Sequence, residues 1–165
     1  MSLHHPKQKA VILDRDGTIN VDKGYVYRKK DFEFIDGTIQ AIRKLNSKGY
    51  KVLVITNQSG IARGFFREED VTKLHRYINE ELQKEGAHID KFYVCPHHPN
   101  DLCFCRKPKL LLFLQAISDF DIDKKELSII GDKESDILPA ITLNCNFYRV
   151  SDSFSLKEIV DHILW

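Results

Sequence analysis

The amino-acid sequence predicts an α/β fold: a Rossmann-like, doubly wound parallel sheet with helices on both of its faces. Short apolar runs alternate along the chain with segments whose apolar residues recur at helical spacing. The apolar runs are mostly continuous, which is typical of strands buried on both faces of a parallel sheet. No repeat, linker or low-complexity tract interrupts the 165 residues. We therefore expect one domain over residues 1–165, a flexible tail over residues 1–8, and right-handed crossovers between the strands.

The first half of the chain contains two strand–helix units. Residues 10–13 (AVIL) and 51–55 (KVLVI) are the two apolar strands. Each is followed by a helix, because apolar residues then recur on one helical face: Ile39, Ile42 and Leu45 after the first strand, and Val71, Leu74, Ile78 and Leu82 after the second. Gly86 is expected to end the second helix.

The second half of the chain continues the same alternation. The expected elements are a strand at 92–94, a helix at 110–117, a strand at 127–130, a short helix at 136–141, a strand at 146–150 and a last helix from about Ser155. No glycine follows the short helix, so Asn144 or Asn146 is expected to adopt the left-handed conformation there. Cys145 is expected to be a small buried apolar residue.

The charge balance excludes a strong long-range field. The chain has 25 Lys and Arg against 24 Asp and Glu, a net charge of +1, which does not steer a nucleic acid or a membrane surface toward it. No apolar segment has the length of a signal peptide or a bilayer span. We therefore expect a cytoplasmic monomer with a small-molecule substrate and neither nucleic acid nor membrane as a partner.

Polar residues follow four of the predicted strands or loops. Asp14 and Asp16 follow the first strand, Thr56 to Gly60 close the second, Arg106 and Lys107 follow the cysteine-rich loop, and Asp132 follows the strand at 127–130. A lone DxDG is also an ordinary turn sequence. Together, the four groups supply what phosphoryl transfer needs: a carboxylate nucleophile, a second acid, a hydroxyl and an ammonium for the phosphoryl oxygens, and an acid for a divalent cation.

The motifs DRDGT, Thr56, Lys107 and GDKESD occur in the order found in the haloacid dehalogenase superfamily of phosphatases, which the chain resembles from about residue 10 to 150. The resemblance implies that Asp14 is the nucleophile and Asp16 the general acid and base. It also implies that Thr56 and Lys107 hold the phosphoryl oxygens, and that Mg²⁺ is bound by Asp14, the Asp16 carbonyl and Asp132. No insertion apart from residues 95–108 is long enough to form a separate cap, so we expect a minimal cap and an open site.

The loop at 95–105 carries a second candidate metal site. Cys95, His97, Cys103 and Cys105 form a full tetrahedral ligand set for a structural zinc, with no open position for catalysis. Cysteines this close together in a reducing cytoplasm indicate a metal rather than disulfides. His98 is an alternative to His97, and Asp136 is either a residue that supports the magnesium ligands or an ordinary helix residue.

The stretches CPHHP, CxCRKP, GYVYR and TNQSGIARG resemble the zinc-containing branch of this superfamily, which includes heptose bisphosphate and histidinol-phosphate phosphatases. The resemblance implies a sugar bisphosphate as substrate. Arg106 and Lys133 would hold the phosphate that is not cleaved, and the sugar would be lined by Asp22, Tyr25, Asn57, Gln58 and Ser59. Alternative functions are hydrolysis of histidinol phosphate or of a nucleic-acid 3′ phosphate. A zinc-stabilised module without catalysis is less consistent with the intact acids.

Overall fold

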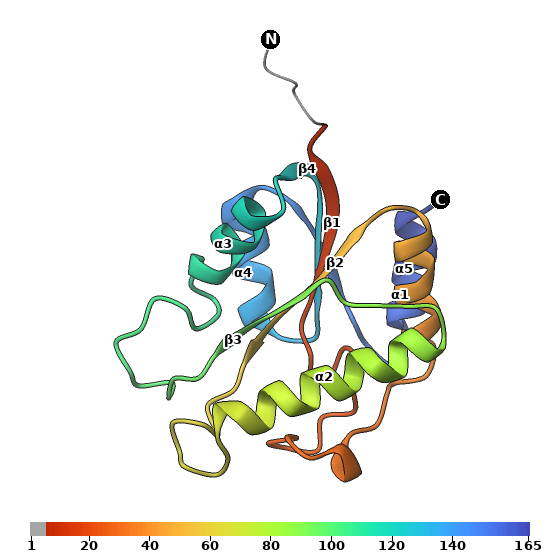
Figure 1. Cartoon of the computed structure of the whole chain (residues 1–165). Coiled ribbons are helices and arrows are strands. Elements are labelled where there is room, and N and C mark those ends of the chain that lie inside the picture. The colour runs from red at the N-terminus through yellow and green to blue at the C-terminus, as the bar shows by residue number, and fades with distance from the viewer. Residues whose placement is uncertain (1–5) are drawn as a thin grey trace.

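The computed structural model describes residues 6–165 and contains one five-stranded parallel sheet in the order β3-β2-β1-β4-β5 (Figure 1). The strands are β1 Gln8–Leu13, β2 Lys51–Asn57, β3 Lys91–Cys95, β4 Ile122–Gly131 and β5 Asn146–Arg149. The helices are α1 Thr38–Ser47, α2 Glu68–Lys84, α3 Leu111–Asp119, α4 Glu134–Leu143 and α5 Leu156–Ile163, with a 3₁₀ turn at Lys29–Asp31.

The central strand β1 is apolar from Ala10 to Leu13 because both of its faces are covered there. Val11 and Leu13 point into the core beneath α1, α2 and α5, whereas Ala10 and Ile12 point into the core beneath α3 and α4. None of these four side chains is more than 1% exposed. Figure 1 shows the two helical layers on opposite sides of the sheet. The predicted doubly wound fold is therefore confirmed.

Two elements are longer than the apolar pattern predicts. β4 begins at Ile122, five residues before the apolar run, because Ile122 pairs with Gln8 across an irregularity in the sheet while the polar residues 123–126 remain partly or fully exposed. α4 begins at Glu134 and ends at Leu143. The expected tail does not reach Gln8, which lies in β1, and residues 1–5 lie outside the described residues.

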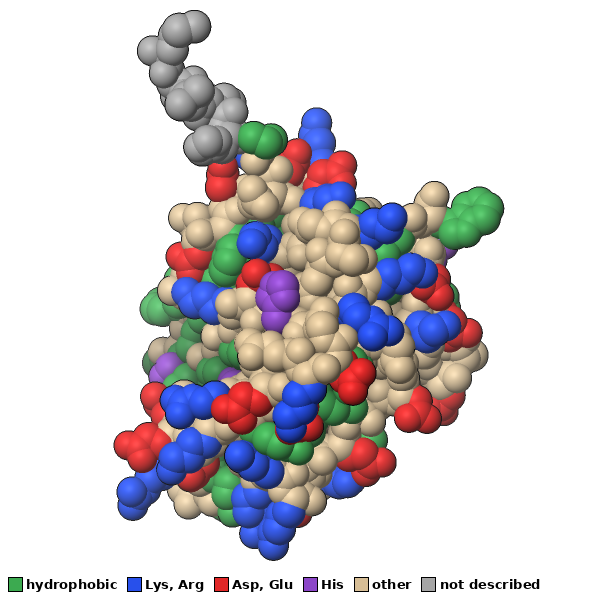
Figure 2. Space-filling view, turned by 45° about the vertical axis from the view of Figure 1, so that its right-hand side comes forward, with side chains coloured by type: hydrophobic (Ala, Val, Ile, Leu, Met, Phe, Trp, Pro, Cys, Tyr) green, Lys and Arg blue, Asp and Glu red, His purple; other side chains and the backbone are tan. Residues whose placement is uncertain are grey.

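The described surface is consistent with the near-neutral charge. The face shown in Figure 2 carries cationic and anionic side chains in a mixed pattern. Among residues 6–165, none of the helices combines the length and the apolar character needed to cross a bilayer.

Asn144 supplies the left-handed turn after α4. Its φ of 54° and ψ of 50° place it in the left-handed region, and its N–H donates to Ile141 O at 3.2 Å. The helix therefore ends at a residue type that tolerates this conformation in place of glycine. Cys145, next in the chain, is only partly buried, and it packs against the core beneath α3 and α4, where burial raises its pKa to about 11.

This turn gives a stability prediction. Asn144→Ala should lower the free energy of unfolding by about 1 kcal/mol, because a Cβ without a hydrogen-bonding amide is strained in this conformation. Asn144→Gly should stay within about 0.5 kcal/mol of the original chain, because glycine adopts this conformation without strain. Chemical denaturation of the three proteins measures both changes. Equal stability of the two variants would contradict this explanation.

Candidate active site

The polar groups that follow β1, β2 and β4 meet at one edge of the sheet. These three strands run in register, with Leu13 opposite both Val54 and Ile130, so their carboxyl ends lie side by side. A cleft of about 270 Å³ opens there, and we call it the active-site cleft. Its lining residues are Asp14, Asp16, Thr56, Asn57, Arg106, Lys107, Lys133 and Ser135.

A buried ion pair lies at the base of the cleft. Lys107 Nζ donates to Asp14 Oδ1 at 2.8 Å and to Asp136 Oδ1 at 2.7 Å, and all three residues are at most 5% exposed. Burial alone lowers the pKa of Lys107, but the charges of Asp14 and Asp136 outweigh it and hold this pKa above its usual value. The ammonium therefore stays charged beside the Asp14 carboxylate.

Asp136 supports Lys107 and also begins α4. Its Oδ2 accepts a hydrogen bond from the Lys133 N–H at 3.3 Å, which caps the first turn of the helix. A Cβ on Gly131 would overlap the Asp136 carboxylate, so a glycine is needed at the end of β4. Asp136 thus contacts the lysine of the cleft and also serves as an ordinary capping residue of the helix.

The Asp16 carboxylate is held by three donors. Its Oδ1 accepts hydrogen bonds from Asn20 Nδ2 and Arg15 Nη2, each at 3.0 Å, and its Oδ2 accepts one from Gln58 Nε2, also at 3.0 Å. Burial raises the pKa of Asp16, but the charge of Arg15 and these hydrogen bonds outweigh it, so the net shift is downward. The carboxylate is thus ionised and fixed in orientation.

The two amides after Thr56 bind protein groups. Asn57 donates through Nδ2 to Lys107 O at 3.2 Å and accepts from the Lys107 N–H at 3.0 Å, so it positions the Lys107 backbone. Gln58, which is only 4% exposed, donates to Thr56 Oγ1 at 2.9 Å as well as to Asp16. Asn57 lines the cleft, whereas Gln58 lies behind it.

An oxygen-rich cluster beside Asp14 fits a hard divalent cation. One carboxylate oxygen from each of Asp14, Asp132 and Asp136 lies within 4.8 Å of the others. Asp132 Oδ1 is buried and has no hydrogen-bond partner among residues 6–165, so this oxygen is free to bind a cation. Burial raises the pKa of Asp132 to about 6, and the nearby Asp14 charge adds to the shift, although Lys133 opposes it. Carboxylate oxygens without a hydrogen-bond partner, such as Asp132 Oδ1, are the kind of ligand that Mg²⁺ prefers.

Glycine is required next to this cluster. Gly17 has a φ of 87°, and a Cβ there would overlap the Asp132 carboxylate. The ammonium of Lys133 lies 3.4 Å from the Asp16 carbonyl oxygen and 3.9 Å from Asp14 Oδ2. Two of the oxygens expected to bind Mg²⁺ therefore face a common cation.

The cysteine-rich loop gathers four donor atoms. Cys95 Sγ lies 3.1 Å from Cys105 Sγ and 3.9 Å from Cys103 Sγ, and His97 Nδ1 lies 3.1 Å from Cys105 Sγ. All four cysteines of the chain are free, and donors around a tetrahedral zinc stand about 3.8 Å apart. The set therefore fits zinc, and it contains His97, whereas His98 Nδ1 accepts from Asn100 N outside the cluster.

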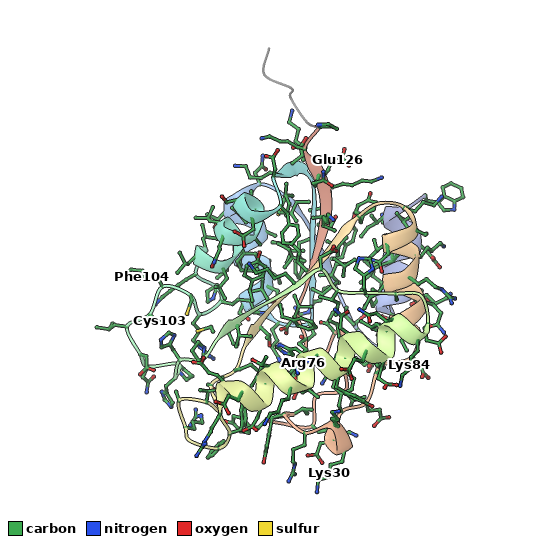
Figure 3. All side chains as sticks on the ribbon, viewed as in Figure 1. Lys30, Arg76, Lys84, Cys103, Phe104 and Glu126 are labelled. Carbon is green, nitrogen blue, oxygen red and sulfur yellow. The ribbon has the colours of Figure 1, made fainter. Side chains whose placement is uncertain are left out.

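The loop connects this cluster to the cleft. Figure 3 labels Cys103 and Phe104 on the segment between β3 and α3, outside the central sheet. Arg106, just after the last cysteine, donates through Nη1 to His97 O at 3.4 Å and lines the cleft. A metal at the cluster would therefore stiffen the segment that carries Arg106 and Lys107.

Besides Gln58, three of the predicted sugar-contacting residues do not line the cleft. Asp22 forms an ion pair with Lys133 at 3.4 Å. Tyr25 is 49% exposed, has a φ of 50° and packs edge to face against Phe65, with ring centroids 4.9 Å apart. Ser59 is partly buried. These residues lie on loops around the site, so only a substrate large enough to extend beyond the cleft would contact them.

Three residues near the site were missed by the sequence reasoning. Ser135 lines the cleft, and the only signal for it is its position between Asp132 and Asp136 in the fourth motif. Arg15 is completely buried and binds Asp16, although its position between two acids suggests a turn. His75 of α2 binds Arg15 across 60 residues of sequence, for which the sequence contains no local signal.

Comparison with known proteins places this site in context. Residues 9–153 match the family described as polynucleotide kinase 3 phosphatase. D-glycero-beta-D-manno-heptose-1,7-bisphosphate 7-phosphatase of Helicobacter pylori (strain ATCC 700392 / 26695) is 49% identical over 134 residues, which cover 81% of this chain and 78% of the relative. The D-glycero-alpha-D-manno-heptose-1,7-bisphosphate 7-phosphatase of Campylobacter jejuni is 48% identical over 131 residues, covering 79% and 75%.

Solved structures agree with the sequence relatives. A D,D-heptose 1,7-bisphosphate phosphatase of B. bronchiseptica, in complex with magnesium and phosphate, matches with a TM-score of 0.86 at 28% identity, covering 95% of this chain and 98% of that chain. A HAD-superfamily hydrolase of Ehrlichia chaffeensis matches with a TM-score of 0.63 at 18% identity, which shows the shared fold.

Proposed function

This chain belongs to the haloacid dehalogenase superfamily of phosphatases and, within it, to the family described as polynucleotide kinase 3 phosphatase, and from this premise we propose that it removes the 7-phosphate of D-glycero-D-manno-heptose 1,7-bisphosphate. The observation that carries the proposal is the cleft, which is lined by a buried acid, Asp14, and a buried lysine, Lys107, and also by two further cations, Arg106 and Lys133. One set suits the phosphate that reacts and the other the phosphate that stays.

In the proposed reaction the Asp14 carboxylate attacks phosphorus and forms an aspartyl phosphate, while Asp16 protonates the departing sugar oxygen. Asp16 then takes a proton from the water that hydrolyses the intermediate. A substrate dianion beside Asp16 raises the pKa of this carboxyl, as an acid role requires. Thr56 and Lys107 stabilise the charge on the phosphoryl oxygens.

Mg²⁺, when bound by Asp14, the Asp16 carbonyl and Asp132, supplies the positive charge that lets a carboxylate approach an anionic phosphate. The buried, unpaired Asp132 oxygen and the oxygen-only donor set support this assignment. Asp136 keeps Lys107 in place beside this cation site.

The second phosphate of the substrate would bind Arg106 and Lys133. A guanidinium binds phosphate through two parallel hydrogen bonds, whereas an ammonium acts as a point charge. Both side chains line the cleft, and Lys133, whose ammonium lies 3.9 Å from Asp14 Oδ2, stands between the buried ion pair and the cleft opening. The sugar would then be surrounded or supported, directly or through neighbouring residues, by Asp22, Tyr25, Asn57, Gln58 and Ser59.

The relatives name both anomers of the sugar at nearly equal identity, 49% for beta and 48% for alpha, so identity does not select an anomer. A nucleic-acid 3′ phosphate is disfavoured by the net charge of +1, since nucleic-acid binding surfaces carry an excess of cations.

We infer that the chain acts as a single-domain cytoplasmic monomer on a soluble sugar phosphate. Its product would serve the synthesis of a surface glycan such as lipopolysaccharide.

We also propose that Cys95, His97, Cys103 and Cys105 bind a structural zinc. Three cysteine sulfurs and an imidazole nitrogen within 4.8 Å of one another, and the absence of disulfides among these cysteines, support this assignment. Zinc would hold the loop so that Arg106 and Lys107 enter the cleft.

The zinc proposal predicts a metal-dependent stability. The purified protein should contain one zinc per chain. Cys103→Ser should lose this zinc, and its free energy of unfolding should fall by about 2 kcal/mol or more. Elemental analysis and thermal melting measure both effects. Cys145→Ser is the matched control and should keep the metal, because Cys145 lies outside the cluster. A metal-free wild-type protein would contradict the assignment.

The nucleophile assignment predicts that Asp14→Asn lowers kcat by about a thousandfold or more, because an amide cannot form the acyl phosphate. Phosphate release measures the change, and a melting curve checks the fold. Asp161→Asn, at an exposed ion pair with Lys44, should keep the original rate. Appreciable turnover by Asp14→Asn would refute the mechanism.

The substrate assignment is tested by kcat/KM on the two anomers of heptose 1,7-bisphosphate, on fructose 1,6-bisphosphate and on histidinol phosphate. One heptose anomer should be hydrolysed most efficiently. Arg106→Ala should weaken kcat/KM on the bisphosphate by about 1.5 to 3 kcal/mol and barely change a matched monophosphate, because only the bisphosphate offers Arg106 an anion.

Two further variants complete this comparison. Lys107→Ala should impair both substrates, since Lys107 contacts the reacting group. Arg43→Ala, on the outer face of α1, should change neither. Equal losses on both substrates for Arg106→Ala would place Arg106 with the reacting phosphate and remove the support for a bisphosphate.

A further inference from the structure

The arginine of the DRD motif points away from the cleft. Arg15 is 0% exposed, although it lies between two residues that line the cleft. Its Nη2 donates to Val26 O at 2.6 Å and to Asp16 Oδ1 at 3.0 Å, and its Nη1 lies 3.2 Å from His75 Nε2. Arg15 Nε is buried without a hydrogen-bond partner among residues 6–165. The orientation of the guanidinium therefore depends on the contacts of its two terminal nitrogens.

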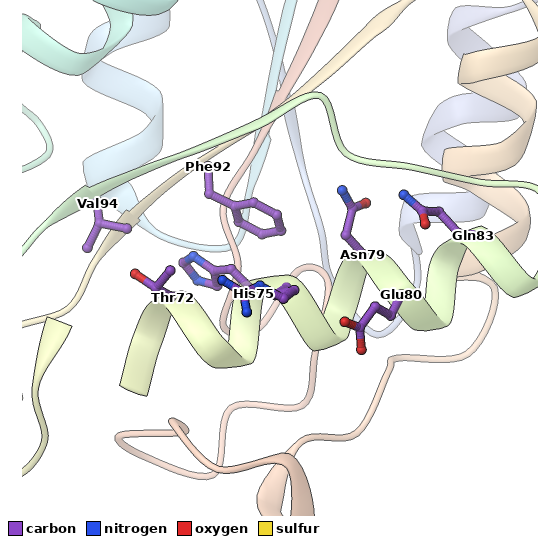
Figure 4. Close-up of a pocket in the computed structure, with 8 residues that line it drawn as sticks. Thr72, His75, Asn79, Glu80, Gln83, Phe92 and Val94 are labelled. Atoms are coloured by element: carbon purple, nitrogen blue, oxygen red, sulfur yellow. The ribbon is translucent and has the colours of Figure 1, made fainter. Parts of the chain in front are cut away.

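His75 holds one of these nitrogens from the far side. It lies on the inner face of α2, is 6% exposed and stacks on Phe92 of β3, with ring centroids 4.1 Å apart and planes 13° from parallel. Figure 4 shows the imidazole between α2 and Phe92. The stacking fixes the ring plane, so that Nε2 faces the guanidinium.

The protonation state of His75 follows from this contact. A guanidinium has donors but no acceptor, so His75 Nε2 must be the acceptor and the ring proton resides on Nδ1. In agreement with this, burial and then the charge of Arg15 lower the pKa of His75 to about 3. His75 is a neutral acceptor with a fixed ring.

We propose that His75 is a positioning residue for phosphoryl transfer: it aims the Arg15 guanidinium, and through it the Asp16 carboxyl, at the leaving oxygen of the substrate. The inference rests on the proposed phosphatase function. The relay runs from Phe92 through His75 and Arg15 to Asp16, and it joins α2 and the edge strand β3 to the proton donor.

A positioning role affects one chemical step. kcat/KM covers the steps up to departure of the leaving group, which needs a proton from Asp16 when the leaving group is a sugar alkoxide. A dinitrophenolate leaves without that proton. Misaligned Asp16 should therefore slow the sugar ester and spare dinitrophenyl phosphate, whereas a general loss of structure slows both.

The test compares two replacements of His75. His75→Phe keeps a flat ring against Phe92 but removes the acceptor, and His75→Gln removes the ring but keeps an oxygen that can accept from Arg15. On heptose 1,7-bisphosphate, His75→Phe should lower kcat/KM about tenfold or more, and His75→Gln should stay within about threefold of wild type. On 2,4-dinitrophenyl phosphate, both should stay within about twofold.

The control and the contrary results are distinct. Gln83→Ala alters the same groove between α2 and β3 without touching the relay and should leave both esters unchanged. Equal losses on both esters, or a better rate for His75→Phe than for His75→Gln, would show a merely structural role and overturn the inference. Should His75→Phe not fold, Arg15→Lys tests the same relay, since a lysine cannot bind Val26, Asp16 and His75 together, and the same split between esters is expected.

Failure of the underlying function gives a different result. If the wild-type chain does not hydrolyse the heptose bisphosphate, fructose 1,6-bisphosphate and histidinol phosphate replace it as the alkyl ester. Hydrolysis of one of them with the split described above keeps the relay and rejects the heptose substrate. No hydrolysis of any ester by the wild type rejects the phosphatase function, and the relay with it.

Discussion

The buried contact of Lys107 with Asp14 and Asp136 is the interaction on which the rest of the site depends. Three ionisable groups leave water together here, and the loss of one partner from such a group costs about 3–5 kcal/mol because the remaining charge is buried without compensation. The contact joins the end of β1, the first turn of α4 and the end of the cysteine-rich loop.

This constraint explains why two kinds of support surround the cleft. Asn57 holds the backbone of Lys107 with both ends of its amide, and Asp136 holds the ammonium. The cluster of Cys95, His97, Cys103 and Cys105 holds together the loop that precedes Lys107. Within it, the carbonyl of His97 accepts a hydrogen bond from Arg106. A lysine on a long loop therefore reaches the central strand with little freedom, as its proposed role in transition-state stabilisation requires.

The acids of the site differ in environment, which separates their roles. Asp14 faces Lys107, Asp16 is held ionised by Arg15, Asn20 and Gln58, and Asp132 has one buried, unpaired oxygen and a raised pKa. These environments suit the roles proposed for the three acids, which are those of a nucleophile, a proton carrier and a cation ligand. Distinct hydrogen-bond partners, rather than distinct side chains, make the difference.

The sequence by itself determined the order and type of the elements and the residues at the strand ends. Continuous apolar runs such as residues 10–13 specify strands covered on both faces, and the carboxyl ends of parallel strands share an edge, so Asp14, Thr56 and Asp132 had to converge. The start of β4 was less well determined, because Ile122 pairs with Gln8 and Leu127 with Ala10, while the polar residues 123–126 between them lie at an irregularity of the sheet and outside the apolar pattern.

Only the tertiary structure decided the strand order, the choice of His97, and the partners of the buried charges. Asp136 meets Lys107 across 29 residues and Arg15 meets His75 across 60, and no local spacing encodes such contacts. They arise because a charge that is buried by the packing of the sheet and helices must find a partner in three dimensions. Local periodicity reflects which face of an element is buried, whereas these pairings depend on which elements pack together.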